Sequence, residues 1–387
     1  NEISKQYLNL GLYSATIDTK VTPQERNRVA IDFYINEGSS ARIKEVSLIG
    51  VTKFDEEDIL GRLDLQPTTF LSWWNKDDRY SRQVLTGELD KIRSFYMNRG
   101  YLDFDIKNTT VSISETKKNV YIAIIIDEGN KYTFGDIKIS GKYYPLTEES
   151  IFQNDIKTKK GEVFSRELLN KSTESINQEL GNYGYAFSNV NPIPDVDKEN
   201  LIVGFNYFIE PGKKVYVRRI SFVGNEKTKD KVLRREMRQF EASYYDKEKI
   251  DQSTRRLKRT QYFEGVDIKT VSVPGISDQV DLTVAVKEKN TGSVKLGAGA
   301  SSDEGLVGSF SVTQANFLGT GNTLSATINT SSVNTIYSIS HIDPYYTLDG
   351  ISRRITAYTK ETNTKDLDTG QYDKKALGLG VGFGISR

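Results

Sequence analysis

The residue types that most often carry enzyme chemistry are scarce in this chain. Cysteine is absent, and histidine occurs once, as His341, which we predict to lie in a turn. A chain with no thiol and one imidazole offers neither a zinc–thiolate site nor a histidine-based catalytic triad. Glu56 and Glu57 are adjacent carboxylates, but they fall in the first turn of a predicted helix, where the helix dipole explains them better than acid–base catalysis does. We therefore predict a protein that is not an enzyme and that uses no metal or cofactor.

A basic cluster in the segment 234–259 could contact phosphate groups. Acidic residues are interleaved with it, and 53 Lys and Arg against 52 Asp and Glu leave a net charge of +1, which disfavours nucleic acid as a partner. Lipid headgroups or an acidic protein partner fit the cluster better. Glycine sets at 297–299 and 378–384 lie in predicted strands without a following helix, so we do not expect a nucleotide-binding loop. The basic residues are Arg234, Arg235, Arg238, Arg255, Arg256, Lys258 and Arg259.

The elements that position these residues come from an internal repeat. A strand pattern closed by glycine occurs three times, as ARIKEVSLIG, YTFGDIKISG and VYVRRISFVG, which end at Gly50, Gly141 and Gly224. Each opening is followed by a helix that ends near an aromatic residue and later by an apolar strand. The period of roughly 80 to 90 residues suits a small domain. We predict whole copies over 41–129, 131–212 and 214–289, and the second half of a copy over 1–38.

Each whole copy reads strand, helix, helix, strand, strand, which predicts two helices on one face of a three-stranded α+β layer. The last strand is apolar and is expected in the centre of the sheet, so the middle strand becomes an edge. Such an edge could accept an extended peptide by β-augmentation. Alternatively it is only a protected edge, blunted by Lys107, Pro192, Pro194 or Lys269. The candidate edge residues are Asp105, Lys107, Val111, Val190 and Ile268.

The third copy contains the helix that begins the basic cluster. Thr228 is the predicted N-cap of this helix, and Glu236 is one of its charges. The residues that recur at helical spacing are Val232, Leu233, Glu236, Met237 and Phe240.

After residue 289 the helical period disappears and apolar residues alternate with polar or small ones. Val294 and Leu296 alternate with Lys295 and Gly297, and from 377 to 385 every second residue is glycine. About six strands of roughly ten residues each, separated by turn residues, are typical of a membrane β-barrel wall. A soluble β-domain with one wet face is the alternative. Closed barrels have at least about eight strands, so we expect the barrel over 290–387 to continue beyond the chain.

The ends of the chain lack the usual marks of a complete precursor. No apolar run of about eighteen residues predicts a transmembrane helix, and no charged-then-apolar leader precedes Asn1. The chain also starts without methionine. We therefore expect a processed product or a fragment.

Several motifs carry a resemblance to a known family. They are VLRREMRQ at 232–239, the stretch 274–293, NFLGTGNTL at 316–324, DPYYTLDG at 343–350 and the loop SWWNKDDRY at 72–80. The repeat resembles the polypeptide-transport-associated (POTRA) domain, and the whole chain resembles the BamA family of outer-membrane protein assembly factors. By register, the half copy resembles the tail of the second POTRA domain, and the whole copies resemble the third, fourth and fifth. The implied fold is tandem POTRA domains followed by the N-terminal part of an antiparallel transmembrane β-barrel.

The resemblance implies a protein of the Gram-negative outer membrane with its POTRA domains in the periplasm. These domains would bind unfolded β-barrel precursors, assembly-complex lipoproteins and periplasmic chaperones, and the barrel would insert precursors into the lipid bilayer. The alternatives are a two-partner secretion or translocation-assembly transporter of the same superfamily, and an enzyme on a repeat scaffold. The first barrel strand would form a lateral seam that templates an incoming strand, through Gly292, Val294, Leu296, Gly297 and Gly299.

Glu236 matches a residue that contacts a lipoprotein partner in this family, and Arg235 and Arg238 flank it. The alternative is a solvated helix charge paired with Arg235 or Lys231, an arrangement of small energetic weight. We therefore expect Glu236→Lys to leave folding intact and to weaken partner binding. Trp73 and Trp74 could anchor a partner or fill a loop over the core.

Overall fold

The computed structural model describes residues 2–25, 28–38, 40–65, 80–302, 304–347, 349–363 and 372–385. The chain divides into two compact units, one of 1–177 with 189–210 and one of 178–188 with 211–387. The loop that contains Trp73 and Trp74 lies outside the described residues, so its role stays a prediction. No helix in the described ranges is long and apolar enough to span a membrane.

The first compact unit contains the half copy, the first whole copy and most of the second whole copy. The half copy consists of helix α1 (Glu2–Asn9) and an antiparallel hairpin of β1 (Thr16–Gln24) and β2 (Arg28–Asn36). The first whole copy follows with β3 (Arg42–Ile49), α2 (Glu56–Leu60), α4 (Arg82–Met97), β4 (Asp105–Ile113) and β5 (Asn119–Asp127).

The other two whole copies repeat this order of elements. The second copy consists of β6 (Thr133–Gly141), α5 (Glu148–Asn154), α6 (Arg166–Asn182), β7 (Asn189–Asp197) and β8 (Ile202–Glu210). The third copy consists of β9 (Tyr216–Val223), α7 (Asp230–Arg234), α8 (Lys247–Arg259), β10 (Phe263–Val273) and β11 (Ile276–Glu288).

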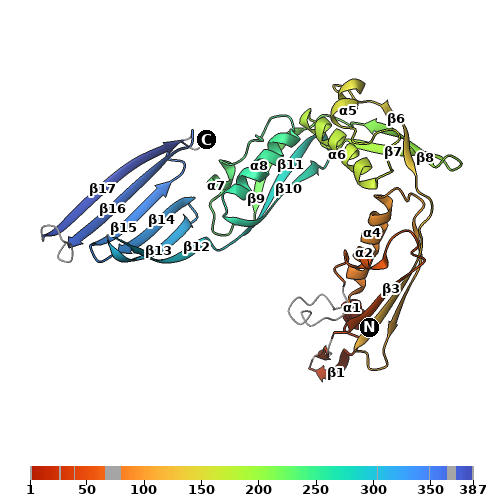
Figure 1. The fold of residues 1–387 in the computed structure, drawn as a ribbon, viewed down its shortest axis with the longest axis horizontal. Helices are drawn as coiled ribbons and strands as arrows, with labels where there is room; N and C mark the ends of the chain where they lie inside the picture. The colour runs from red at the N-terminus through yellow and green to blue at the C-terminus, as the bar shows by residue number, and fades with distance from the viewer. Residues whose placement is uncertain are drawn as a thin grey trace. The chain divides into compact units, whose positions relative to one another are not determined.

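All three copies share one strand order, β3-β5-β4, β6-β8-β7 and β9-β11-β10. The last strand of each copy lies in the centre, parallel to the opening strand and antiparallel to the middle strand. The predictions of a central last strand and an edge middle strand are confirmed. Figure 1 shows helix α8 lying along the sheet of β9, β10 and β11.

The glycine that closes each opening strand is required by the backbone. Gly50, Gly141 and Gly224 have φ values of +101°, +96° and +84°, where residues with a side chain are strained. A Cβ atom at these positions would meet a carbonyl oxygen of the central strand, at Ile126, Ile209 or Val286. The repeat signature therefore marks a close approach of two backbones.

The cores of the first and third copies form between the sheet and its helices. In the first copy Ile122 and Ile124 of the central strand are at most 2% exposed, and Ile92 of α4 is fully buried against the same cluster. In the third copy Leu282 and Val284 occupy the matching place. The alternation of the strands and the apolar stripe of each long helix therefore meet in one layer.

Six strands follow in one antiparallel sheet in the part of the chain that the structure describes. Each strand pairs with the next, and β12 and β17 form the two sides (Figure 1). The strands are β12 (Gly292–Ser301), β13 (Gly305–Phe317), β14 (Asn322–Thr330), β15 (Asn334–Asp343), β16 (Ile351–Asn363) and β17 (Asp373–Ile385).

The register of this sheet gathers apolar residues on one face. Leu296 lies opposite Phe310, Phe310 opposite Ile328 and Ile328 opposite Tyr337, and the same face continues to Leu377 through Thr359. The other face carries many serine, threonine and glycine residues, together with larger side chains such as Lys295, Ile336 and Tyr358. The predicted alternation is confirmed. His341 was placed wrongly in a turn: it lies inside β15, with Nε2 3.3 Å from Nδ2 of Asn322.

Candidate strand-binding groove and sheet junction

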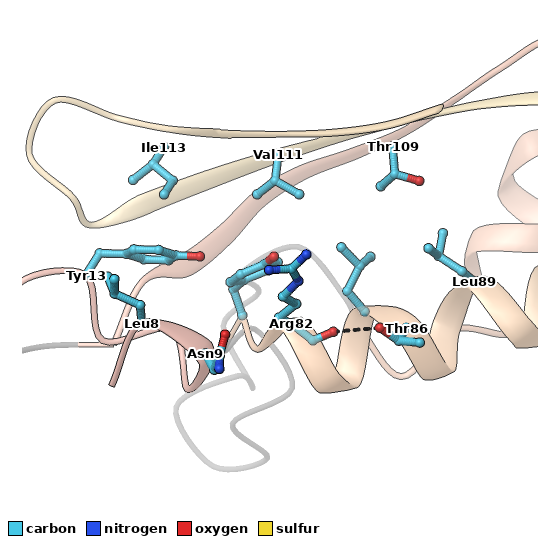
Figure 2. Close-up of a pocket in the computed structure, with 11 residues that line it drawn as sticks. Leu8, Asn9, Tyr13, Arg82, Thr86, Leu89, Thr109, Val111 and Ile113 are labelled. Atoms are coloured by element: carbon cyan, nitrogen blue, oxygen red, sulfur yellow. Dashed lines mark hydrogen bonds between the residues drawn. The ribbon is translucent and has the colours of Figure 1, made fainter. Parts of the chain in front are cut away.

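A groove of about 510 Å³ lies beside the edge strand β4 in the first compact unit. Figure 2 shows Thr109, Val111 and Ile113 of β4 along one wall and Arg82, Thr86 and Leu89 of α4 along the other. Alternate residues of a strand share one face, and residues three or four apart share one face of a helix. The local geometry of the two elements therefore aligns two rows of side chains across the groove.

The half copy closes one end of this groove. Leu8, Asn9 and Tyr13 line that end, and the Tyr13 ring stacks on Tyr80 with 6.0 Å between ring centroids. The pKa of Tyr13 is raised to about 12, mainly by burial and to a smaller extent by the neighbouring Tyr80. The sequence alone did not identify Leu8, Tyr13 or Tyr80 as functional residues, because no motif linked the half copy to the edge of the next sheet.

In the second and third copies, the start of the opening strand is covered on its outer side by a segment of the same copy. Phe134 N donates to Glu162 O at 2.8 Å, and Phe164 N donates to Tyr132 O at 3.0 Å. In the third copy Val217 N donates to Ser243 O at 2.9 Å, so β9 is covered in the same way. Each middle strand also lies at an edge of its sheet, and within the described residues it pairs with the central strand alone.

The predicted edge residues occupy different positions on these strands. Lys107 lies at a β-bulge of β4, and its Nζ forms ion pairs with Asp105 at 3.3 Å and with Asp127 at 3.4 Å. After the bulge, residues 108–113 pair regularly with β5. Val111 faces the groove. Val190 of β7 is only 5% exposed, and Ile268 of β10 packs against the core of the third copy. An added strand would therefore contact the backbone at Val190 and Ile268, because their side chains are turned toward the core.

The helix predicted to include Glu236 ends before this residue, so Glu236 lies in a turn. Helix α7 stops at Arg234, and a tight turn follows in which Glu236 N donates to Leu233 O at 3.0 Å. Glu236 is only 5% exposed, so the alternative of a solvated helix charge is wrong. Thr228 is not the N-cap either: Lys229 is, and the Thr228 hydroxyl instead accepts from Asn316 Nδ2 at 2.7 Å.

The Glu236 carboxylate joins the third copy to the turn between β15 and β16. Its Oε2 lies 2.9 Å from Arg256 Nη2, and its Oε1 lies 3.6 Å from Arg235 Nε. Arg256 Nη2 also donates to the Tyr345 hydroxyl at 2.7 Å, and the Arg235 guanidinium lies 4.2 Å from the centre of the Tyr345 ring. The structure thus brings Glu236 and Arg235 together. Arg238 lies apart from this contact: its Nη1 donates to Met237 O at 3.2 Å.

A second turn of the sheet packs on the same copy. Gly319, in the turn between β13 and β14, has a φ of +68° and accepts from Lys229 N at 2.9 Å. The Tyr262 hydroxyl donates to Gly321 O at 3.1 Å from the same turn. The motifs NFLGTGNTL and DPYYTLDG therefore supply the two turns that hold the six-stranded sheet against the third copy.

The strand predicted as a lateral seam lies at one side of the six-stranded sheet. Every residue of β12 is exposed, including Leu296 at 81% and Val294 at 63%. A Cβ at Gly299 would meet no atom within 4 Å, and Gly292 and Gly297 would meet the side chains of Gln314 and Ser309. Within the described residues β12 pairs with β13 alone, so its outer edge is free.

Comparison with known sequences identifies the repeats. The POTRA family, described as "Surface antigen variable number repeat", matches residues 1–38, 41–129, 132–212 and 215–289. The chain belongs to the POTRA family. The "Omp85 superfamily domain" matches residues 316–387, which cover most of the six-stranded sheet. The fold is thus a series of POTRA domains followed by the first strands of an Omp85-type β-barrel.

Several curated proteins are similar to most of this chain. The chain is 32% identical over 385 residues to "Outer membrane protein assembly factor BamA" of Neisseria meningitidis serogroup B, covering 99% of this chain and 48% of the relative. It is 31% identical over 342 residues to the protein of the same name from Buchnera aphidicola, covering 88% and 55%. The chain thus spans about half the length of these curated relatives.

Two solved structures are similar to parts of the chain. The BamA of Haemophilus ducreyi lacking POTRA domains 1–3 aligns with a TM-score of 0.58 and 32% identity, over 65% of this chain and 47% of that one. The POTRA3-5 segment of Haemophilus influenzae BamA aligns with a TM-score of 0.56 and 26% identity, over 64% of this chain and 96% of that segment.

Proposed function

We propose that this chain is part of an outer-membrane protein assembly factor, anchored in the bacterial outer membrane with its POTRA copies in the periplasm. The named relatives and the order of POTRA and Omp85 matches support this function. By the same resemblance the half copy corresponds to the second POTRA domain and the whole copies to the third, fourth and fifth. The substrate is the unfolded chain of another outer-membrane β-barrel protein, and the assembly requires no cofactor.

The groove beside β4 is the observation that carries the proposal. An unfolded strand exposes N–H and C=O groups whose burial in lipid is costly until another strand pairs with them. The free edge of β4 over 108–113 offers such pairing. Each main-chain hydrogen bond contributes about 1 kcal/mol net, so several bonds give weak and reversible binding that does not depend on sequence.

The side chains of the groove add a preference for alternating strands. Val111 and Ile113 of β4 and Leu89 of α4 give the groove an apolar part between polar residues such as Arg82 and Thr86, so every second side chain of an added strand would meet these apolar residues. The intervening side chains would face away from the helices, where a polar residue is tolerated. Alternation of apolar and polar residues is the pattern of outer-membrane barrel strands.

The remaining partners are proposed from the resemblance and from the exposed surfaces. Lipoproteins of the assembly complex would contact the third copy near Glu236, Arg235 and Arg238, and periplasmic chaperones would deliver the precursor. The exposed apolar face of the six-stranded sheet would contact the lipid bilayer. The free edge of β12, with its small residues Gly297 and Gly299, would act as the lateral seam that templates the incoming strand.

A pair of variants in β4 tests the proposal. Val111→Lys places a charge in the groove, whereas Ser112→Lys places the same charge on the exposed opposite face of the same strand. The affinity of the purified chain in detergent for a fluorescent ten-residue alternating Val/Thr peptide is measured by anisotropy. Val111→Lys should weaken binding by about tenfold, equal to about 1.4 kcal/mol, and Ser112→Lys should leave it unchanged. The same variant should slow barrel folding by the full-length protein in liposomes.

Equal affinity for wild type and both variants would remove the groove from the proposal. An alternating peptide that binds no better than one with the same residues in blocks would remove the preference for alternation. Circular dichroism of each variant shows whether the sheet is retained.

A further inference from the structure

The edge strand of the second whole copy differs chemically from that of the first. β7 carries two prolines, Pro192 and Pro194, which lie opposite Tyr207 and Phe205 of β8. The pairing of β7 with β8 runs from Asn189 to Asp197 without a register shift. β4 contains no proline between Asp105 and Ile113.

The unbroken pairing fixes the direction in which the proline nitrogens point. In an antiparallel pair, residues alternate between those that bond to the partner strand and those whose N–H and C=O point outward. Proline has no N–H, and within a sheet it is tolerated where that nitrogen faces away from the ladder. The nitrogens of Pro192 and Pro194 therefore face the free edge of β7.

Two consecutive outward donors are thus missing from the edge that an added strand would need. The outward positions of β7 are Val190, Pro192, Pro194 and Val196, so a strand laid along this edge would lose the two central N–H groups. The pyrrolidine rings also occupy the space where those N–H groups would be. The carbonyl oxygens alone leave the added strand's own acceptors unpaired, which costs free energy comparable to the lost bonds.

We propose that the free edge of β7 is closed to strand addition by Pro192 and Pro194, while the edge of β4 stays open to it. The proposal rests on the proposed function, since it assumes that an extended main chain pairs with POTRA edges. Under it, an unfolded barrel strand bound at the first whole copy finds no second pairing site on the next copy. The second whole copy then acts as a spacer along which the substrate is not held.

Photo-crosslinking of the whole chain in detergent to an alternating Val/Thr peptide tests this proposal. Benzoylphenylalanine replaces Thr110 in one protein and Ile193 in another, because both side chains are exposed on the sheet face turned away from the helices. In the wild-type background we expect an adduct at position 110 and at least tenfold less at position 193. With Pro192→Val and Pro194→Val together, the adduct at 193 should rise to the yield seen at 110.

Asn191→Val together with Asp195→Val is the matched control. These positions bond toward β8, so two valines are added without restoring an outward donor, and the adduct at 193 should stay low. The single variant Pro194→Val should give an intermediate yield, which keeps the test valid if the double proline variant folds poorly.

The outcomes separate the two proposals. Equal adducts at 110 and 193 in the wild-type background would overturn the closed edge and leave strand binding intact. An adduct at 110 with none at 193 in either proline variant would also overturn the role of the prolines. The lack of an adduct at 110 would instead contradict the proposed function.

Discussion

Glu236 and Arg256 form an ion pair in which the carboxylate is buried, with 2.9 Å between Oε2 and Nη2, and Arg256 in turn donates to the hydroxyl of Tyr345. The pair links a turn after α7 and helix α8 to the turn between β15 and β16. A carboxylate in this position sets the arrangement of the two guanidinium groups that hold the tyrosine. The main structural role of Glu236 is therefore to stabilise the junction between the third copy and the six-stranded sheet.

Glu236→Lys is expected to loosen this junction, contrary to the prediction from sequence that folding stays intact. Removal of one partner of a buried pair costs about 3–5 kcal/mol, and the Arg256 side chain is still 30% exposed, so we expect the lower end. The new lysine would also lie beside two arginines. Hydrogen exchange in the segment 344–347, measured at the amides of Tyr345, Tyr346 and Thr347 because Pro344 has no N–H, should become faster in Glu236→Lys.

Glu226→Lys provides the control for this variant. Glu226 is exposed, so the same change of charge should leave exchange at 344–347 unaltered. If both variants exchange alike, the buried pair does not hold the turn.

Arg238→Glu is expected to separate partner binding from the junction. Arg238 forms no ion pair among the described residues, and its guanidinium donates only to main-chain carbonyls at Arg235 and Met237. Its charge is thus available to a partner. Reversal of the charge should weaken lipoprotein binding by about tenfold or more while exchange at 344–347 stays the same.

Arg219→Glu, on the exposed part of β9, should leave lipoprotein binding unchanged. A pull-down of the purified lipoprotein with each variant checks both expectations. Normal binding by Arg238→Glu would remove this residue from the partner site.

Glu128 is expected to make the stability of the first copy depend on pH. Burial raises the pKa of this carboxyl, but hydrogen bonds from the Thr52 hydroxyl, the Lys53 and Thr52 N–H groups and Tyr96 more than offset it, so the pKa is lowered. A lowered folded pKa means that the ionised form favours folding. This stabilisation is fully present above the unfolded pKa of 4.5 and is lost as the pH falls through the folded value.

Glu128→Gln should remove that part of the pH dependence. Urea unfolding of wild type and variant between pH 7 and pH 3 measures it, and the two curves should converge at the acidic end. In the third copy the Glu288 carboxylate accepts hydrogen bonds from Lys227 N at 3.0 Å and from Thr228 N at 2.7 Å. Burial raises the pKa of Glu288, but these bonds more than offset it, so its pKa is lowered as that of Glu128 is. Glu288→Gln should therefore behave alike, and a constant difference at all pH values would contradict the assignment for either residue.

The order of elements could be predicted from the sequence because each depends on local patterns. Three patterns predict features that the structure confirms. The closing glycines mark positions of positive φ, the apolar runs mark the central strands, and the alternation after residue 289 marks the strands of the six-stranded sheet. The face alternation of the sheet follows in the same way, since a strand has a fixed period of two.

The position of single polar residues could not be predicted in this way. Glu236 lies at helical spacing with Val232 and Leu233, yet the helix ends at Arg234 and the chain continues in a tight turn in which Glu236 N donates to Leu233 O. Thr228 is a residue type that is common at N-caps, but its hydroxyl instead accepts a hydrogen bond from Asn316, 88 residues away in the sequence. The end wall of the groove likewise depends on Tyr13 and Tyr80, which meet only in the folded chain.

Gly319→Ala is expected to detach the turn between β13 and β14 from the third copy. Gly319 has a φ of +68°, which costs a residue with a side chain about 1–2 kcal/mol. A Cβ there would also run into the carbonyl of Lys227, so the turn must move away and lose the bond from Lys229 N to Gly319 O. Hydrogen exchange at Lys229 reports this bond directly and should become faster.

Gly350→Ala separates backbone strain from the contact. Gly350 has a φ of +85°, but the nearest atom to its Cβ would be Tyr345 Cε1 at 3.7 Å, an ordinary contact. The conformational cost is therefore similar at the two sites, while only Gly319→Ala breaks the packing against the third copy. Exchange at Lys229 should rise in Gly319→Ala and stay at the wild-type rate in Gly350→Ala. Equal exchange in the two variants would mean that the NFLGTG turn does not hold the sheet to the third copy.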